Sequence, residues 1–391
     1  FNKTLGLILV VFTAIKNKIK NFNKPKKDFN DLKNINIAYV LVGFPTLSET
    51  FVLNELRYLV ENDYNISVFC YVDPMDPVEL DFDLNVIRFD DVENPKEKLK
   101  KLLKEHDIDL IHSHFVYPPA TEYTYPVAKE LGIPFTVFAH AVDIFRKMCD
   151  ENNNLTEIAN DKNCKAIFTL GDYHKNYLLE RNVPKDKIII TKQATGYEIT
   201  PIKDKTSNIV EIISLSRFVE KKGLDILIDV ADILKDEDLN FSMYGSGILE
   251  EQLQNKIAQL NLNNISIKGV LNGFDEVQKC FSKSDVLVAP CRIAENGDRD
   301  GFPTVIFEAM AYGIPVITTD VSVIPEVIKD NYNGFIVEQN NPKALADKII
   351  EVKNLSQSEL LKIRKQAQKD VIKTSSVEKT MDTLIDTWKR I

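Results

Sequence analysis

The sequence predicts an α/β protein with two doubly wound, parallel-sheet domains that face each other across a cleft. From residue 33 onward, short apolar and β-branched runs alternate with longer stretches of helical character, which is typical of parallel sheets covered on both faces. A less regular stretch at 197–208 interrupts this alternation once. The chain of 391 residues is too long for one ordinary core and fits two domains of about 150 to 200 residues each.

Eleven strands are expected, six before the irregular stretch and five after it. The first six are 35–42, 66–72, 110–112, 135–138, 166–170 and 187–191. The last five are 209–215, 240–244, 265–268, 286–290 and 315–319. We therefore expect a first domain at 33–196, a linker at 197–208 and a second domain at 209–375, before a final helical segment at 376–391. Helical patterns at 355–369 and 377–391 end the chain.

The first 32 residues differ from the rest of the chain. Residues 5–15 form an apolar run, and a cluster of lysines follows it. The run is shorter than the roughly 20 residues that span a bilayer, and no small-residue cleavage site of a signal peptide follows it. Two interpretations remain open: a helix lying on the anionic cytoplasmic face of a membrane, or a helix packed on the protein beside a solvated basic tail.

Composition excludes several classes of protein. The chain is 44% apolar and 27% charged, which is normal for a soluble globular protein, and its net charge of −9 argues against nucleic acid as a partner. Its cysteines are odd in number and lack C-x-x-C spacing. They are Cys70, Cys149, Cys164, Cys280 and Cys291. We expect reduced thiols in a cytoplasmic protein, with no disulfide or zinc framework.

The tract 298–319 is expected to form a loop, a short helix and a strand. Pro303 suits the first turn of the helix, Gly313 suits its C-terminal end, and the β-branched run at 316–319 suits the strand. A helix that opens after Gly301 directs free backbone N–H groups and the positive end of its dipole into the loop. A diphosphate is the ligand that such an end accepts.

Two carboxylates flank this predicted anion site. Asp300 precedes the helix, and Glu308 lies one turn into it on the same face as Thr304. Carboxylates repel phosphate but accept hydrogen bonds from pairs of sugar hydroxyl groups. The combination indicates a nucleotide sugar, with its phosphates on the helix end and its ribose and hexose on the acids. The expected donor-binding residues at this end are Gly301, Phe302, Pro303 and Thr304.

This tract resembles the E-x7-E signature of the retaining GT-B glycosyltransferases of family 4. Here Asp300 and Glu308 are followed by Ala-Met-Ala-x-Gly-x-Pro-Val-Ile-x-Thr, and the resemblance extends roughly from residue 35 to the end. Asp300 replaces the usual Glu, as in the subgroup that builds bacterial exopolysaccharides such as colanic acid. The resemblance implies two Rossmann-like domains and a last helix that crosses back, so that Trp388 is buried against the first domain. A helix that only caps the second domain is the alternative.

Arg217 and Lys222 are the expected phosphate-binding cations. They lie in the tract 214–223 after a predicted strand, where a planar guanidinium and an ammonium group could converge on a diphosphate. The tract is similar to the family's G-R-x4-K-G motif, with Ser216 in place of the usual Gly. That similarity implies that both cations bind the donor phosphates and stabilise the leaving group. Lys221 could replace Lys222 if the turn differs, and a solvated charge run is the other interpretation.

Three further loops are donor-site candidates. Gly245 and Gly247 follow a strand and allow close approach of backbone to a nucleotide, although this spacing alone is a weak signal. The resemblance implies that the main chain near Val270 holds the base and that the loop containing Gly43 faces the diphosphate and the acceptor. A plain turn at Val270, and a helix cap at Ser48 without a role in catalysis, are equally open.

Histidines end two of the predicted strands. His112 and His114 point to one face, so zinc must be considered, but the spacing supplies no third ligand. His140 resembles the family's histidine near the reacting sugar, where it would hydrogen-bond the donor hexose; a buried histidine without such a role is the alternative. Asp298 and Asp300 spell D-x-D, the metal motif of the other major glycosyltransferase fold. No metal or other cofactor is expected, because the cations and the helix end already supply positive charge.

We therefore expect a retaining hexosyltransferase of bacterial cell-surface polysaccharide synthesis. Its donor is a UDP- or GDP-sugar, and its acceptor is a saccharide or a lipid-linked oligosaccharide. The expected catalytic residues are Arg217, Lys222, Asp300 and His140. Two alternatives remain: an enzyme similar to UDP-N-acetylglucosamine 2-epimerase on the same fold, and a non-catalytic subunit that binds a sugar nucleotide.

Overall fold

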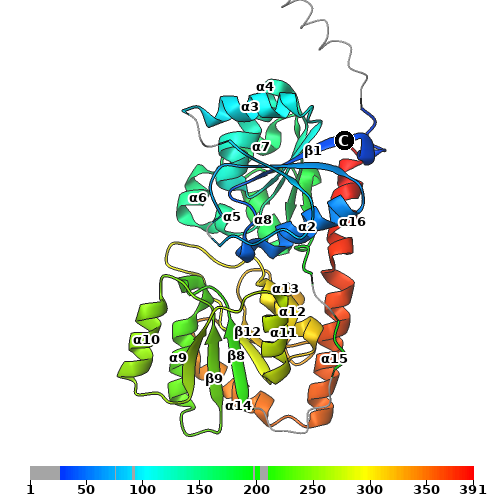
Figure 1. Cartoon of the computed structure of the whole chain (residues 1–391). Coiled ribbons are helices and arrows are strands. Elements are labelled where there is room, and N and C mark those ends of the chain that lie inside the picture. Colours follow the sequence, from blue (N-terminus) through cyan, green and yellow to red (C-terminus); the bar gives the residue numbers. More distant parts are fainter. Residues whose placement is uncertain (1–26, 75, 90–92, 197–198, 203–209) are drawn as a thin grey trace, which may run out of the picture.

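The structure consists of two parallel β-sheets, each covered by helices, one above the other in Figure 1. The computed structural model describes residues 27–74, 76–89, 93–196, 199–202 and 210–391. The apolar run at 5–15 and most of the predicted linker lie outside these residues. Within them, no helix combines the length and the apolar character needed to cross a bilayer.

The first sheet has seven strands in the order β3-β2-β1-β4-β5-β6-β7, and every pairing is parallel. Its strands are β1 Asn36–Leu41, β2 Asn65–Cys70, β3 Asn85–Arg88, β4 Leu110–His114, β5 Phe135–Phe138, β6 Cys164–Thr169 and β7 Ile188–Ile190. All six strands expected here are confirmed. The sequence did not indicate β3, because this four-residue edge strand is only partly buried and carries no apolar run.

The second sheet has six strands in the order β10-β9-β8-β11-β12-β13, again all parallel. Its strands are β8 Glu211–Leu215, β9 Asn240–Tyr244, β10 Ile265–Gly269, β11 Val286–Ala289, β12 Val316–Thr319 and β13 Phe335–Val337. The five expected strands are confirmed, and the three-residue β13 was missed because it is too short to show a pattern.

Helices connect the strands and cover both faces of each sheet. Those of the first half are α2 Thr50–Glu61, α3 Pro95–Glu105, α4 Tyr125–Leu131, α5 Val142–Phe145, α6 Lys147–Asn152, α7 Leu155–Asn160 and α8 Asp172–Glu180. Those of the second half are α9 Leu224–Ile233, α10 Glu250–Gln259, α11 Phe274–Lys283, α12 Thr304–Tyr312, α13 Ile324–Val327 and α14 Pro342–Lys353. The strand order reverses at β1/β4 and at β8/β11, and ligands of doubly wound sheets bind at such points.

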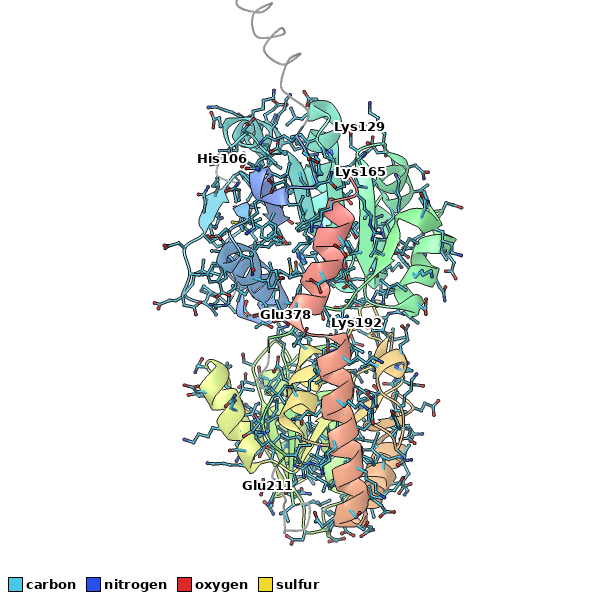
Figure 2. All side chains as sticks on the ribbon, turned by 90° about the vertical axis from the view of Figure 1, so that its right-hand side faces the viewer. His106, Lys129, Lys165, Lys192, Glu211 and Glu378 are labelled. Atoms are coloured by element: carbon cyan, nitrogen blue, oxygen red, sulfur yellow. The ribbon has the colours of Figure 1, made fainter. Side chains whose placement is uncertain are left out.

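Two helices at the end of the chain join the halves. α15 (Gln357–Thr374) runs along the second sheet and α16 (Val377–Trp388) along the first, as Figures 1 and 2 show. Glu378 and Lys192 mark their junction in Figure 2, where the Thr380 hydroxyl group donates to the Lys192 carbonyl at 2.9 Å. Trp388 is fully buried, and its indole N–H donates to the Thr136 hydroxyl group at 3.2 Å. The predicted crossing is confirmed, and the alternative of a cap on the second domain is wrong.

All five cysteines lie among the described residues and are buried, and no disulfide bond joins them there. Burial raises the pKa of the Cys149 thiol to about 11 and that of Cys164 to about 12. Both groups are therefore protonated at neutral pH, and neither has the character of a nucleophile.

A carboxylate from the second half caps a helix of the first half. Glu326 in α13 accepts the N–H groups of Asp172 and Tyr173 at 3.0 and 2.8 Å, at the start of α8. A Cβ atom at Gly171 would collide with this carboxylate, so the close approach requires glycine. The contact uses the free amides and the positive dipole end of α8 to hold the two halves together.

Glu326→Ala is expected to loosen this contact. Loss of a helix cap costs about 1 kcal/mol, which corresponds to roughly fivefold to tenfold faster hydrogen exchange of the amides of Asp172 and Tyr173. The matched control is Glu359→Ala, which removes the capping box of α15 within one half and should leave those two amides unchanged. Equal exchange of the α8 amides in Glu326→Ala and the wild type would contradict the role of Glu326.

Candidate active site

The N-terminus of α12 is uncapped and lies at the carboxyl end of β11. The helix begins at Thr304, so Pro303 is the residue that precedes it rather than part of its first turn as predicted. Pro303 provides no side-chain cap, and Gly313 ends the helix in the left-handed conformation as expected. Phe302 is buried and stacks on Phe307 with ring centroids 4.1 Å apart, which fixes the loop at the start of the helix.

Two lysines lie beside this helix end and pair with two aspartates. Lys222 Nζ is 2.7 Å from Asp300 Oδ2, and Lys221 Nζ is 3.0 Å from Asp298 Oδ1. Both lysines belong to the 3-10 helix η5 (Glu220–Lys222), which follows β8. Burial alone would raise the pKa of Asp300, but the ammonium groups of Lys222 and Lys221 lower it to about 2. Asp300 is therefore ionised and holds Lys222 in place.

The ion pairs with lysine bear on whether the D-x-D pattern of Asp298 and Asp300 binds a metal ion. Asp298 and Asp300 each face a lysine ammonium group, which occupies the side where a divalent ion would have to bind. The absence of a metal requirement remains a prediction. Asp300 also accepts from the Cys291 thiol at 3.5 Å.

A small cavity of about 10 Å³, room for about one water molecule, lies beside these groups. Its lining comes from the ends of β8 and β11, the start of α12 and Lys222, with Ser216, Ala289, Cys291, Pro303 and Val305 among the lining residues. Lys222 lines this pocket and Lys221 does not, so the structure favours Lys222 as the ligand-facing cation.

Arg217 lies in the turn after β8 with an exposed side chain. Among the described residues its guanidinium group forms no hydrogen bond or ion pair, so it is free to bind an anion. Its charge nevertheless acts on Asp300 from the second half and on Glu49 from the first half, which places it between the two.

Gly245 and Gly247 have a packing role. A Cβ atom at Gly245 would overlap the Ser216 carbonyl oxygen, and one at Gly247 would lie 2.6 Å from the Phe218 carbonyl oxygen. Both glycines have positive φ, and the Ser246 carbonyl accepts from Phe218 N–H at 2.7 Å. The turns after β8 and β9 thus press directly together beside the pocket. A contact of these glycines with the donor remains a prediction.

Val270 and Gly43 lie at the ends of other strands. Val270 follows β10 and is 44% exposed, which leaves its backbone accessible to a ligand. Gly43 follows β1, and a Cβ atom there would lie 3.2 Å from Asp73 and Pro74 backbone atoms. The glycine therefore allows the loops after β1 and β2 to pack, and the donor-binding roles of both residues stay predictions.

Glu308 is partly buried and lies one turn into α12. Burial raises its pKa to about 7, and a hydrogen bond from the Thr304 side chain opposes this shift. The carboxyl group is therefore about half protonated at neutral pH. Its proton must leave before both oxygens can accept from a ribose diol.

We expect donor affinity to rise with pH up to about 7 because of Glu308. Below a pKa of about 7, the Glu308 carboxyl group of the free protein is protonated and must lose its proton when the donor binds. Donor affinity should therefore increase by up to about tenfold per pH unit below this value and level off above it. Calorimetric titration with UDP-glucose, whose diphosphate stays ionised across this range, measures the effect. Glu308→Gln serves as the control and should show a flat profile; an unchanged slope in this variant would exclude Glu308.

His140 lies beside the start of α12. A Cβ atom at Gly301 would be 3.3 Å from the His140 carbonyl oxygen, so the loop before α12 contacts the strand end that carries this histidine. The His140 ring stacks on Phe138 with centroids 4.5 Å apart. Asp143 accepts the His140 N–H at 3.1 Å and the Val116 N–H at 2.7 Å, which fixes the backbone. The structure thus brings together Gly301 and His140, which are 161 positions apart in the sequence.

His112 and His114 do point to one face, and the fold supplies the third group that their spacing lacked. Glu55 of α2 lies within 4.8 Å of a ring nitrogen of each histidine, and all three side chains are buried. Glu55 Oε2 is 3.0 Å from His114 Nε2, whereas Glu55 Oε1 and His112 Nε2 have no hydrogen-bond partner among the described residues.

Two functional candidates were missed at the level of sequence. Glu49 ends the 3-10 helix η2 (Leu47–Glu49); burial raises its pKa to about 7, and the guanidinium charge of Arg217 acts in the opposite direction. Glu55 is the only charged residue among the buried positions of α2. Its placement in an otherwise apolar helix face is a signal that could have indicated it.

These features define a two-domain GT-B glycosyltransferase. A crystal structure of Anabaena Alr3699/HepE in complex with UDP and glucose aligns with a TM-score of 0.74 at 16% identity, covering 92% of this chain and 100% of the other, and shows the shared fold.

The chain belongs to the family of glycosyl transferases group 1, whose model matches residues 198–370, and its first half matches Glycosyltransferase Family 4 at residues 48–191. An uncharacterized glycosyltransferase of Methanocaldococcus jannaschii is 33% identical over 281 residues, which cover 72% of this chain and 75% of that protein. The Escherichia coli K12 protein described as a colanic acid biosynthesis glycosyltransferase, WcaL, is 30% identical over 210 residues, 52% of each chain. The predicted family and subgroup resemblance are confirmed.

Proposed function

We propose that this glycosyltransferase moves a hexosyl group, with retention, from a nucleoside diphosphate sugar to a hydroxyl group of a saccharide. The observation that carries the proposal is the uncapped N-terminus of α12 beside the pocket lined by Lys222. Main-chain amides and an ammonium group together bind phosphate oxygens, and Arg217, which has no ion pair among the described residues, adds a further cation. The HepE structure was solved with UDP and glucose, and this supports a nucleotide-sugar donor.

The chemistry follows from charge development. The bond between the anomeric carbon and the phosphate oxygen breaks, and negative charge grows on the departing diphosphate. Lys222, Arg217 and the amides at Thr304 and Val305 stabilise that charge. The acceptor oxygen bonds to the anomeric carbon on the same face, and its proton passes to a phosphate oxygen of the leaving group. Asp300 orients Lys222, and both Asp300 and His140 hydrogen-bond the donor sugar. Glu308 accepts hydrogen bonds from the ribose hydroxyl groups.

The acceptor is proposed to be a lipid-linked saccharide of bacterial exopolysaccharide synthesis, used at the cytoplasmic face of the membrane. The similarity to the colanic acid protein supports this assignment. The donor base is tested by thermal shift with UDP, GDP and ADP, because a ligand at 100 times its Kd adds about 2.7 kcal/mol of stability. No shift with any nucleoside diphosphate would contradict the donor site.

Transfer itself is tested with the selected donor and a panel of lipid-linked saccharides. Retention predicts that the product keeps the donor's anomeric configuration, which NMR coupling constants report. Release of nucleotide without any acceptor would instead favour the epimerase-like alternative. Binding without turnover on any acceptor would favour a non-catalytic subunit.

A further inference from the structure

A continuous chain of buried side chains leads from α2 to His140. His114 Nε2 lies 3.0 Å from Glu55 Oε2, and His114 Nδ1 lies 2.9 Å from His140 Nε2. Gln193 Nε2 lies 3.4 Å from His140 Nδ1 at the far end. Glu55 and His114 have no exposed surface, and His140 and Gln193 are 4% and 7% exposed.

The polarity of each hydrogen bond follows from the chemistry of its ends. A carboxylate only accepts, so His114 Nε2 carries a proton that is donated to Glu55. With the Gln193 amide oriented as in this structure, its nitrogen donates, so His140 Nδ1 accepts and carries no proton. The proton between the two rings therefore sits on His140 Nε2 and is donated to His114 Nδ1. Both imidazoles are then neutral and share one tautomer.

The surroundings keep His140 in this state. Burial is the largest cause that lowers the pKa of His140 well below its usual value, so the ring stays neutral. The His140 ring stacks on Phe138 with centroids 4.5 Å apart and lies nearly parallel to the His114 ring, to which it is hydrogen-bonded at 2.9 Å. Stacking fixes the plane of the His140 ring, and a 180° flip within that plane would break its hydrogen bonds, so the two together define one orientation.

Burial of the Glu55 carboxylate is unfavourable for the stability of the fold. The other buried residues of α2 are apolar: Phe51, Val52, Leu56 and Leu59. A buried carboxylate is expensive unless hydrogen bonds compensate for its lost hydration. Glu55 Oε1 has no partner among the described residues, and Oε2 has His114 and, at 3.3 Å, the Tyr39 hydroxyl group. Packing alone would favour an apolar residue at this position.

We propose that Glu55 and His114 are positioning residues that hold His140 as its Nε2–H tautomer, with the Nδ1 lone pair directed toward a hydroxyl group of the donor sugar. This inference rests on the proposed function, which places His140 beside that sugar. In this structure the Gln193 amide N–H donates to His140 Nδ1 and takes the place proposed for the sugar hydroxyl group. Glu55 and His114 act through His140 and touch no substrate.

The tautomer is tested on wild-type protein without any substrate. The chain has five histidines, so selective ¹⁵N labelling gives few ring signals, assigned by single substitutions. We expect both His114 and His140 to carry a proton on Nε2 and none on Nδ1. A protonated Nδ1 on His140, or a doubly protonated ring on either residue, would overturn the proposal, and this result does not depend on whether the protein turns over a donor.

The consequence for catalysis is tested with Glu55→Gln. A glutamine can turn its amide N–H toward His114 and reverse the chain, so turnover should fall by about 10-fold to 100-fold while the donor KM changes less than about threefold. Tyr39→Phe is the matched control: it removes the other donor to Glu55 Oε2, leaves the pair with His114 intact, and should keep turnover within about threefold. The ¹⁵N signals of His140 should shift in the first variant only.

The outcomes separate this proposal from the proposed function. If Lys222→Ala loses turnover and Glu55→Gln does not, the proposed donor site is supported and the proposed positioning role of Glu55 and His114 is contradicted. If the wild type turns over no donor, the proposed function fails and the tautomer measurement still decides the chain. Elemental analysis of the purified protein tests whether Glu55, His112 and His114 bind a metal ion instead. One equivalent of zinc that is lost on substitution of Glu55 or His112 would show that they do, and it would overturn the proposal.

Discussion

Lys222→Ala is expected to reduce turnover by about 100-fold to 1,000-fold, the scale seen when one donor to a developing oxyanion is removed. Lys222 lines the pocket beside α12, and its ammonium group is oriented by Asp300 at 2.7 Å. The leaving diphosphate gains charge only as the anomeric bond breaks, so the loss should appear mainly in kcat and less in the donor KM.

Steady-state kinetics with saturating acceptor measures this effect. Lys235→Ala is the matched control, because Lys235 pairs with Asp232 on the exposed surface of the same half, far from the pocket lining. That variant should retain turnover within about twofold. Lys222→Met, which keeps the aliphatic volume, should behave like Lys222→Ala. Wild-type kcat in both Lys222 variants would remove this residue from the site and leave Arg217 and the helix end as the anion-binding groups.

Trp388→Ala is expected to destabilise the first half by about 3 to 5 kcal/mol, the range for removing a buried aromatic side chain. Trp388 is fully buried and contacts the rings of Tyr39 and His112 edge-on at centroid distances of 6.4 and 5.5 Å. Its indole N–H donates to Thr136. Removal leaves a cavity between α16 and the sheet, and α16 is the connection that ties the two halves together.

Hydrogen exchange of the β1 amides measures this loss, because central strands exchange only through large openings of their domain. Trp388→Phe keeps most of the ring volume and should cost less than the alanine variant. Tyr332→Ala is the control for an aromatic residue that is 55% exposed in the other half, and it should leave β1 unchanged within about 0.5 kcal/mol. A loss below about 1 kcal/mol in Trp388→Ala would show that α16 docks without this side chain.

The sequence predicted the parts of the site that depend on neighbouring residues. The loop, helix and strand at 298–319 were recognisable because a proline before a helix, a glycine after it and a β-branched run each act within a few positions. The turn that carries Lys222 was recognisable for the same reason. Alternation of apolar runs from residue 33 onward was sufficient for the two parallel sheets, since their central strands bury both faces.

The tertiary structure decided which of these parts meet. Lys222 pairs with Asp300 across 78 positions, His114 with Glu55 across 59, and Glu326 caps α8 across about 150. Pairs of this kind leave no periodic or local pattern, because each residue fits its own helix or turn equally well with or without its partner. Two short strands, β3 and β13, were missed because pairing with a longer neighbour, rather than their own composition, makes them strands.

By itself, the sequence determined the fold class and the helix end that can bind a diphosphate, since backbone propensity and apolar periodicity are local properties. The family followed from the resemblance of the tract around Asp300 and Glu308 to a known motif. Only the tertiary structure revealed that Asp300 is ion-paired to Lys222 and that His140 belongs to a buried chain ending at Glu55. Hydrogen bonds and ion pairs between distant segments form when packing brings the two ends within about 3 Å, and that distance is set by the whole fold.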